Sequence, residues 1–111
     1  MNGAELTLSG DVYSPDGRVP VVMIGIGRND GTSVYGVSTE MDGAAPRRVA
    51  PDRYAFSLAL PELALLPGKY VVRAHALDPE GLRLFDTVER PLVVTGDARE
   101  YGVVRLDHRW D

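Results

Sequence analysis

The chain has 111 residues, with 12 Lys and Arg against 16 Asp and Glu, and a formal net charge of -4 at pH 7. This length suits a single domain spanning residues 1–111. The acidic balance argues against a nucleic-acid partner, because binding to a phosphate backbone needs a basic face. The absence of cysteine excludes disulfides and thiolate metal sites. No leader-like N-terminus or bilayer-length apolar run is visible, so we expect a soluble, cytoplasmic protein if Met1 is a natural start.

Apolar residues in the first half of the chain follow strand patterns. Residues 4–12 alternate between apolar and polar side chains, which predicts a strand with one buried face. Turn residues at 14–17 predict a hairpin after it. The almost continuous apolar run 21–26 predicts a strand buried on both faces at the centre of a sheet. A short strand is expected at 33–37, and the segment 42–51, rich in Gly and Pro, is expected to form a loop.

The second half begins with the strictest alternation in the chain. Tyr54, Phe56 and Leu58 share one side of a predicted strand, and together with Tyr70 they are assigned to the core. Residues 61–66 could form one helical turn, which Pro67 and Gly68 would end.

The remaining segments also predict strands. Residues 70–77 form one, and residues 82–94 form a final pair of segments interrupted by Pro91, which marks an edge or a bulge. A last strand is expected at 102–106. Short strands at regular spacing, with no long helical period, predict an all-β fold: an immunoglobulin-like antiparallel β-sandwich of about seven strands.

Patterns typical of catalysis are weak. The two histidines, His75 and His108, lie on separate expected segments without the helical spacing of a zinc hydrolase. No serine lies in a G-x-S-x-G context, and no phosphate-binding loop or calcium loop is present. The acidic residues Asp78, Glu80 and Asp86 could in principle hydrolyse a glycoside, but turn chemistry explains them better. We therefore expect no enzyme activity, no catalytic residue, no metal and no cofactor.

Sugar binding requires planar polar groups for hydroxyls and aromatic faces for C–H patches. The chain carries such residues on or beside its expected strands, and they could meet on one sheet face. Each also has a structural explanation: an aromatic packing partner, a surface ion pair between Arg73 and Asp86, or a C-terminal Trp that plugs the core or contacts a second copy. The candidate glycan-binding residues are Arg28, Tyr35, Arg73, His75, Asp86 and Trp110.

Three segments carry a resemblance to a known family. They are Ile-Gly-Arg-Asn-Asp-Gly at 26–31 followed by Val-Tyr-Gly-Val-Ser-Thr at 34–39, Leu-Leu-Pro-Gly-Lys-Tyr at 65–70, and Gly-Val-Val-Arg-Leu-Asp-His-Arg-Trp at 102–110. In this order they resemble the carbohydrate-binding domain that ends the ATP-binding subunit of O-antigen polysaccharide ABC exporters of the Wzt type. The resemblance covers the chain from about residue 3 to its end.

The resemblance implies recognition rather than catalysis. It implies a non-catalytic module that binds an O-antigen-like polysaccharide for export, with the transporter ATPase and membrane subunits as partners at the inner face of the inner membrane. The His and Trp after the Gly-Val-Val segment recur in the family pattern, which adds His108 to the candidate glycan-binding residues and keeps Trp110 among them. Exchange of the C-terminal strand between protomers in relatives implies a homodimer. Two alternatives remain, a structural or protein-interaction sandwich and an accessory domain of a carbohydrate-modifying transferase.

Overall fold

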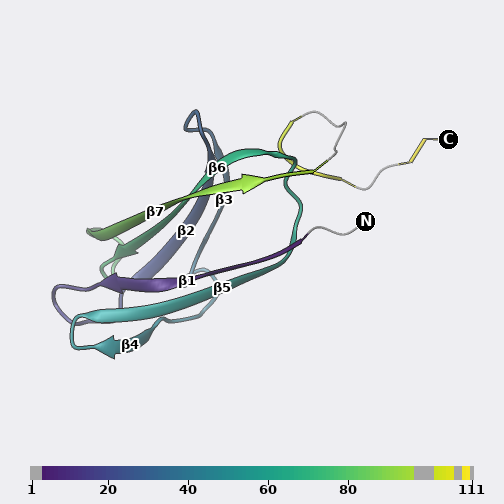
Figure 1. The fold of residues 1–111 in the computed structure, drawn as a ribbon. Helices are drawn as coiled ribbons and strands as arrows, with labels where there is room; N and C mark the ends of the chain where they lie inside the picture. Colours follow the sequence, from purple (N-terminus) through teal and green to yellow (C-terminus); the bar gives the residue numbers. More distant parts are fainter. Residues whose placement is uncertain (1–3, 97–101, 107–108, 111) are drawn as a thin grey trace.

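The computed structural model describes residues 4–96, 102–106 and 109–110. Within these residues the chain forms two antiparallel sheets that face each other, and the expected all-β sandwich of about seven strands is confirmed (Figure 1). One sheet has the order β1-β5-β4, built from Ala4–Tyr13, Arg53–Leu63 and Arg47–Ala50. The other has the order β3-β2-β6-β7, built from Ser33–Ser38, Val21–Arg28, Gly68–Leu77 and Leu84–Val94. None of the described segments is a helix that could span a membrane.

The core lies between the two sheets and is supplied mainly by the larger one. Alternate residues of β2 and β6 are buried, and β1 and β5 add Val12 and Tyr54. Burying each large side chain contributes roughly 1.5–3 kcal/mol. Phe56 and Leu58, for which the sequence predicts a place in the core, pack against it but are only half-buried. Both residues line a cavity between the sheets. The inner face of β5 is therefore buried less completely than the alternation of its side chains predicts.

The prediction that residues 21–26 are buried on both faces is wrong. β2 does lie inside its sheet, between β3 and β6, but its burial alternates and Met23 is 41% exposed. The reason is that the outer face of the β3-β2-β6-β7 sheet is not covered by any other described element.

The expected helical turn at 61–66 is also wrong, because β5 continues to Leu63 and pairs it with Ala4. The register of β1 and β5 shifts between Ala4 and Leu6, opposite the position of Pro61. Such an irregularity accommodates a residue without a backbone N–H.

Two further segments differ from expectation. The segment 42–51 contains the short strand β4, which pairs Arg47 with Ala55. Residues 102–106 do not form a strand but a single bridge between Val104 and Leu65, flanked by two backbone bonds of 2.7 Å between residues 103–105 and 64–66. The expectation for Pro91 is confirmed, since β7 is an edge strand.

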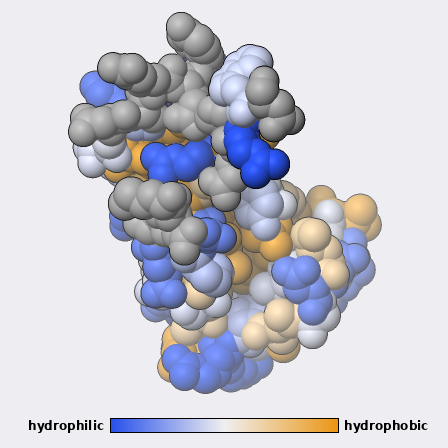
Figure 2. Space-filling view, turned by 90° about the vertical axis from the view of Figure 1, so that its right-hand side faces the viewer, coloured by the Kyte–Doolittle hydropathy of each residue, from blue (hydrophilic) through white to orange (hydrophobic). Residues whose placement is uncertain are grey.

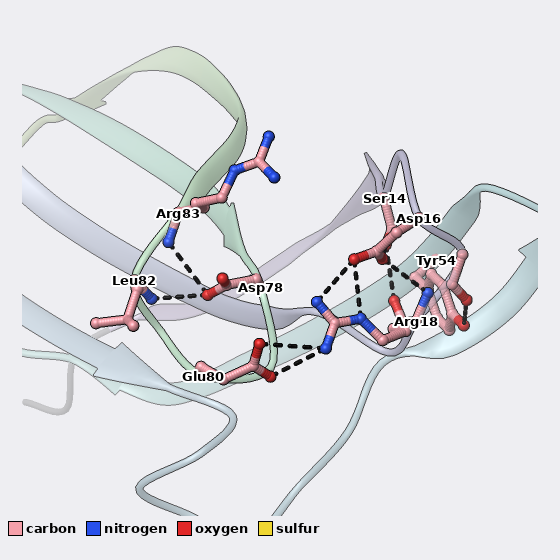
Figure 3. Close-up of polar contacts among 9 residues, drawn as sticks. Ser14, Asp16, Arg18, Tyr54, Asp78, Glu80, Leu82 and Arg83 are labelled. Carbon is pink, nitrogen blue, oxygen red and sulfur yellow. Dashed lines mark hydrogen bonds and ion pairs between the residues drawn. The ribbon is translucent and has the colours of Figure 1, made fainter.

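Polar contacts hold together the end of the sandwich where β1 turns into β2. Arg18 lies between the carboxylates of Asp16, at 2.8 Å, and Glu80, at 3.1 Å, and so links the β1–β2 turn to the β6–β7 turn (Figure 3). The hydroxyl of Tyr54 donates to the carbonyl oxygen of Gly17 at 2.7 Å. Exposed ion pairs are individually weak, so this cluster fixes the turns more than it stabilises the whole fold.

Candidate functional site

Two of the residues that the sequence nominates for glycan binding lie together on the outer face of the four-stranded sheet. Arg73 and His75 are on β6, and their neighbours Val72 and Ala74 are buried. Side chains alternate across a strand, so Arg73 and His75 point away from the core. Because β6 is flanked by β2 and β7, both residues stand on the interior of the sheet and not at its edge.

Each of these side chains is held by a residue of β7. Arg73 Nε donates to Glu89 Oε2 at 2.6 Å, and His75 Nδ1 lies 3.0 Å from Thr87 Oγ1. The ladder places Arg73 opposite Glu89 and His75 opposite Thr87, so both contacts follow from the register of β6 and β7. On the other side, Met23 of β2 stands opposite His75.

Glycines form the floor beside Arg73. The ladder places Gly25 opposite Arg73 and Gly36 of β3 opposite Gly25. A Cβ added at Gly25 would meet only a backbone oxygen at 3.7 Å, and one added at Gly36 only a backbone oxygen at 3.9 Å. No side chain of the described residues therefore lies within 4 Å of an added Cβ at these two positions. Glycine weakens a strand interior and often marks a place where another molecule approaches the backbone closely.

We call this surface the β6 face and define it by seven residues of the four-stranded sheet. They comprise a paired guanidinium and carboxylate, an imidazole beside a hydroxyl, a thioether and two bare glycines. Its members are Met23, Gly25, Gly36, Arg73, His75, Thr87 and Glu89.

Tyr35 and Asp86 do not belong to the β6 face. Tyr35 pairs with the buried Ile26 and lines a cavity between the sheets together with Leu60. Asp86 pairs with the buried Ala76, and its Oδ2 accepts a hydrogen bond from the backbone N–H of Tyr13. Both positions therefore face the inner side of the sheet. The ion pair of Arg73 with Asp86, which was the structural alternative to glycan binding for these two residues, does not form, because Arg73 pairs with Glu89.

The remaining nominated residues lie at chain ends or turns. Arg28 is the exposed last residue of β2, where its backbone N–H bonds to the Thr32 carbonyl oxygen of the β2–β3 turn. Trp110 is 91% exposed, so it is not a core plug within the described chain. His108 lies outside the described residues.

Several members of the β6 face were missed by sequence reasoning. Thr87 and Glu89 flank the apolar Val88 in β7, but Asp86 and Arg90 interrupt the alternation, and only the ladder shows which residue of β6 each one meets. Gly25 and Gly36 carried the signal of a glycine inside a strand pattern. No group of three metal-binding side chains occurs among the residues that the structure describes.

Among the residues that the structure describes, those of both sheets line apolar cavities between the sheets. A cavity of about 300 Å³ is lined by Ile26, Val34, Tyr35, Leu60 and Leu63, among others, near the end of β5. The end view in Figure 2 shows apolar surface lying between hydrophilic groups. The β6 face, in contrast, is a shallow polar surface on the outside of one sheet.

Comparison with known proteins agrees with this fold. No protein-family model matches the sequence, and no curated protein is significantly similar to it. Among solved structures, the C-terminal domain of Wzt is similar, with a TM-score of 0.65 and 20% sequence identity over 96% of this chain and 68% of that chain. The resemblance in the sequence is thus confirmed at the level of the fold.

Proposed function

We propose that this protein is a non-catalytic polysaccharide-binding module of a bacterial ABC exporter and that it holds an O-antigen-like glycan on the β6 face. The observation that carries the proposal is the fixed pair of Arg73 and Glu89 standing beside the bare floor of Gly25 and Gly36. A sugar ring can approach such a floor closely and meet charged donors and acceptors at its side.

The chemistry of the β6 face matches that of a sugar. A guanidinium offers five N–H donors and a carboxylate offers only acceptors, whereas each hydroxyl of a sugar both donates and accepts. Arg73 and Glu89 hold each other in place, so less side-chain freedom is lost when a ligand binds. Met23, at 41% exposure, offers an apolar contact for C–H groups of the ring.

The remaining parts of the proposal rest on the similarity of the fold to the C-terminal domain of Wzt. They are the exporter ATPase and membrane subunits as partners, and a cytoplasmic position at the inner face of the inner membrane. Arg28, Tyr35, His108 and Trp110 stay proposed as secondary contacts to a long glycan. Asp86 is assigned instead to the bond with Tyr13.

We also propose a homodimer formed by exchange of the C-terminal segment. Residues 103–105 bond to residues 64–66 of the same chain through two short backbone bonds. The same bonds are available between two copies, because an exchanged segment reproduces its contacts in the partner. Light scattering of the intact protein and of residues 1–100 tests this: the intact protein is expected as a dimer and the shortened one as a monomer or an insoluble product.

Titration calorimetry with purified O-antigen polysaccharides tests glycan binding. Arg73→Ala is expected to weaken binding about tenfold or more, since it removes charged hydrogen bonds worth about 1.5–3 kcal/mol. Arg47→Ala is the matched control, because Arg47 is exposed on β4 of the other sheet. An equal loss of glycan affinity in both variants would show only an effect of the changed net charge. A folded protein that binds no glycan would instead favour the protein-interaction sandwich.

A further inference from the structure

Within the described residues, no strand pairs with the outer edge of β1. β1 pairs only with β5 among the described strands, and it pairs continuously from Leu6 to Tyr13. The backbone N–H of Tyr13 points away from β5, because it bonds to Asp86 of β7. Backbone groups alternate along an antiparallel strand, so those of Thr7, Ser9 and Asp11 point the same way. No bond satisfies these three amides in the described chain.

This edge lacks the protection that β7 carries. β7 has Pro91 within the strand, and Asp86 and Arg90 are paired with the buried residues Ala76 and Val72, so they point inward at its edge. Proline and inward-pointing charges are devices that keep edge strands from pairing with other chains. Between Leu6 and Tyr13, β1 contains no proline and no inward-pointing charge.

A cleft of about 250 Å³ opens alongside the unprotected part of β1, between it and β7. Its polar members include Asp11 and Arg90. The apolar part of its lining includes core residues of both sheets, namely Leu8, Ile24, Phe56, Val72, Ala74 and Val88. A strand added to β1 would send every second side chain into this cleft and cover the half-buried Phe56.

The charges on β1 indicate what kind of strand fits. Glu5 and Asp11 are exposed to solvent, and neither belongs to an ion pair of the described chain. A second copy fits poorly, because antiparallel pairing of two β1 strands about Leu8 sets Glu5 opposite Asp11, and like charges directly opposite each other destabilise a sheet. A strand with basic side chains at these positions meets both carboxylates favourably.

We propose that β1 is a docking edge for an extended segment of another protein, which pairs with β1, places apolar side chains in the cleft at every second position and presents basic side chains beside Glu5 and Asp11. The free amides of Thr7, Ser9 and Asp11 supply affinity, and the cleft and the two carboxylates supply selectivity. This surface is separate from the β6 face, so protein and glycan can bind at once.

A fluorescein-labelled nine-residue peptide that alternates valine with lysine is the probe, and fluorescence anisotropy is the measurement. Saturable binding is expected, and the same peptide N-methylated at its central lysine and valine residues is expected to bind at least about tenfold more weakly, because it cannot complete the ladder. A peptide with glutamate in place of lysine is expected to bind more weakly than the lysine peptide. Asp11→Lys is expected to reverse that preference.

Ser9→Pro tests the docking edge of β1 by a change in the protein instead of in the peptide. The N–H that it removes points outward, so the ladder between β1 and β5 keeps its bonds. Circular dichroism is expected to show an intact fold while peptide binding is lost. The proposal is overturned if the lysine peptide does not bind the unaltered protein, or if it binds and N-methylation has no effect. Self-association of the protein that Ser9→Pro abolishes would identify a second copy as the occupant and overturn it as well.

Discussion

The backbone N–H of Tyr13 donates to Oδ2 of Asp86 at 3.1 Å, and this bond joins the edge of β1 to the edge of β7. It is a direct bond between the two sheets near the end of the sandwich that Arg18 and Glu80 also link. The carboxylate thus caps a backbone donor that would otherwise stay open at a sheet edge. Asp86 therefore has a structural role in this fold.

Asp86→Ala is expected to lower the free energy of unfolding by about 1 kcal/mol, since it deletes one partly solvated hydrogen bond to a charged acceptor. Asp86→Asn keeps an amide oxygen at this position and is expected to retain most of the stability. Urea unfolding of the three proteins gives the comparison. Equal stability of all three would show that the bond does not hold the sheets together, and loss of glycan binding in Asp86→Asn would return Asp86 to the ligand site.

The lowered pKa of Asp78 leads us to expect that the folded protein loses stability in acid. Burial by itself would raise the pKa of Asp78, but hydrogen bonds from the backbone N–H groups of Arg83 and Leu82 lower it below its ordinary value of 3.8 (Figure 3). A lowered pKa in the folded state contributes stability above the unfolded pKa, near 3.9, and that stability disappears as the pH falls through the folded value. Melting temperature is therefore expected to fall below about pH 4.

Asp78→Asn isolates this contribution. The amide oxygen can still accept from both backbone donors, but it carries no charge and does not titrate. The variant is expected to show a shallower fall of melting temperature in acid than the parent. Asp42→Asn is the control, because Asp42 is exposed in a turn. The same shallower profile in both variants would contradict a specific role of Asp78.

Phe56 is expected to contribute less to the free energy of unfolding than the alternating pattern of its strand implies. Because Phe56 is half-buried and lines open clefts, Phe56→Ala is expected to cost about 1–3 kcal/mol, below the range for a fully buried aromatic residue. Ile24, which is 6% exposed, gives the reference, and Ile24→Ala is expected to cost about 2–5 kcal/mol. Chemical denaturation measures the free energy of unfolding of both variants. A larger cost at Phe56 would show that the inter-sheet cleft is closed in solution.

Gly25→Ala is expected to change stability and glycan binding in opposite directions. The added Cβ meets only a backbone oxygen at 3.7 Å, so the variant is expected to gain about 0.5–1 kcal/mol of stability from reduced freedom of the unfolded chain. The same methyl group raises the floor beside Arg73 and is expected to weaken glycan binding. Thermal melting and calorimetry measure the two effects. If the variant binds glycan as tightly as the parent, the glycine floor is not part of the binding site.

Local patterns in the sequence predict the strands, whereas the site depends on register. Alternation along 4–12 and 70–77 predicts β1 and β6, and Pro91 marks an edge strand. The partner of Arg73 could not be predicted in this way. Asp86 and Glu89 are three residues apart, so their side chains point to opposite faces of β7. A shift of one residue in the register between β6 and β7 would exchange the faces to which the two carboxylates point.

The position of the glycan on the protein is measured most directly by titrating ¹⁵N-labelled protein with O-antigen polysaccharide and following the backbone amide resonances. The largest shifts are expected at Gly25, Gly36, Arg73 and His75, while the amide resonances of β1 and β5 are expected to change little. Shifts confined to the cleft beside β1, or the absence of any shift at saturating polysaccharide, would contradict the assignment of the β6 face as the binding surface.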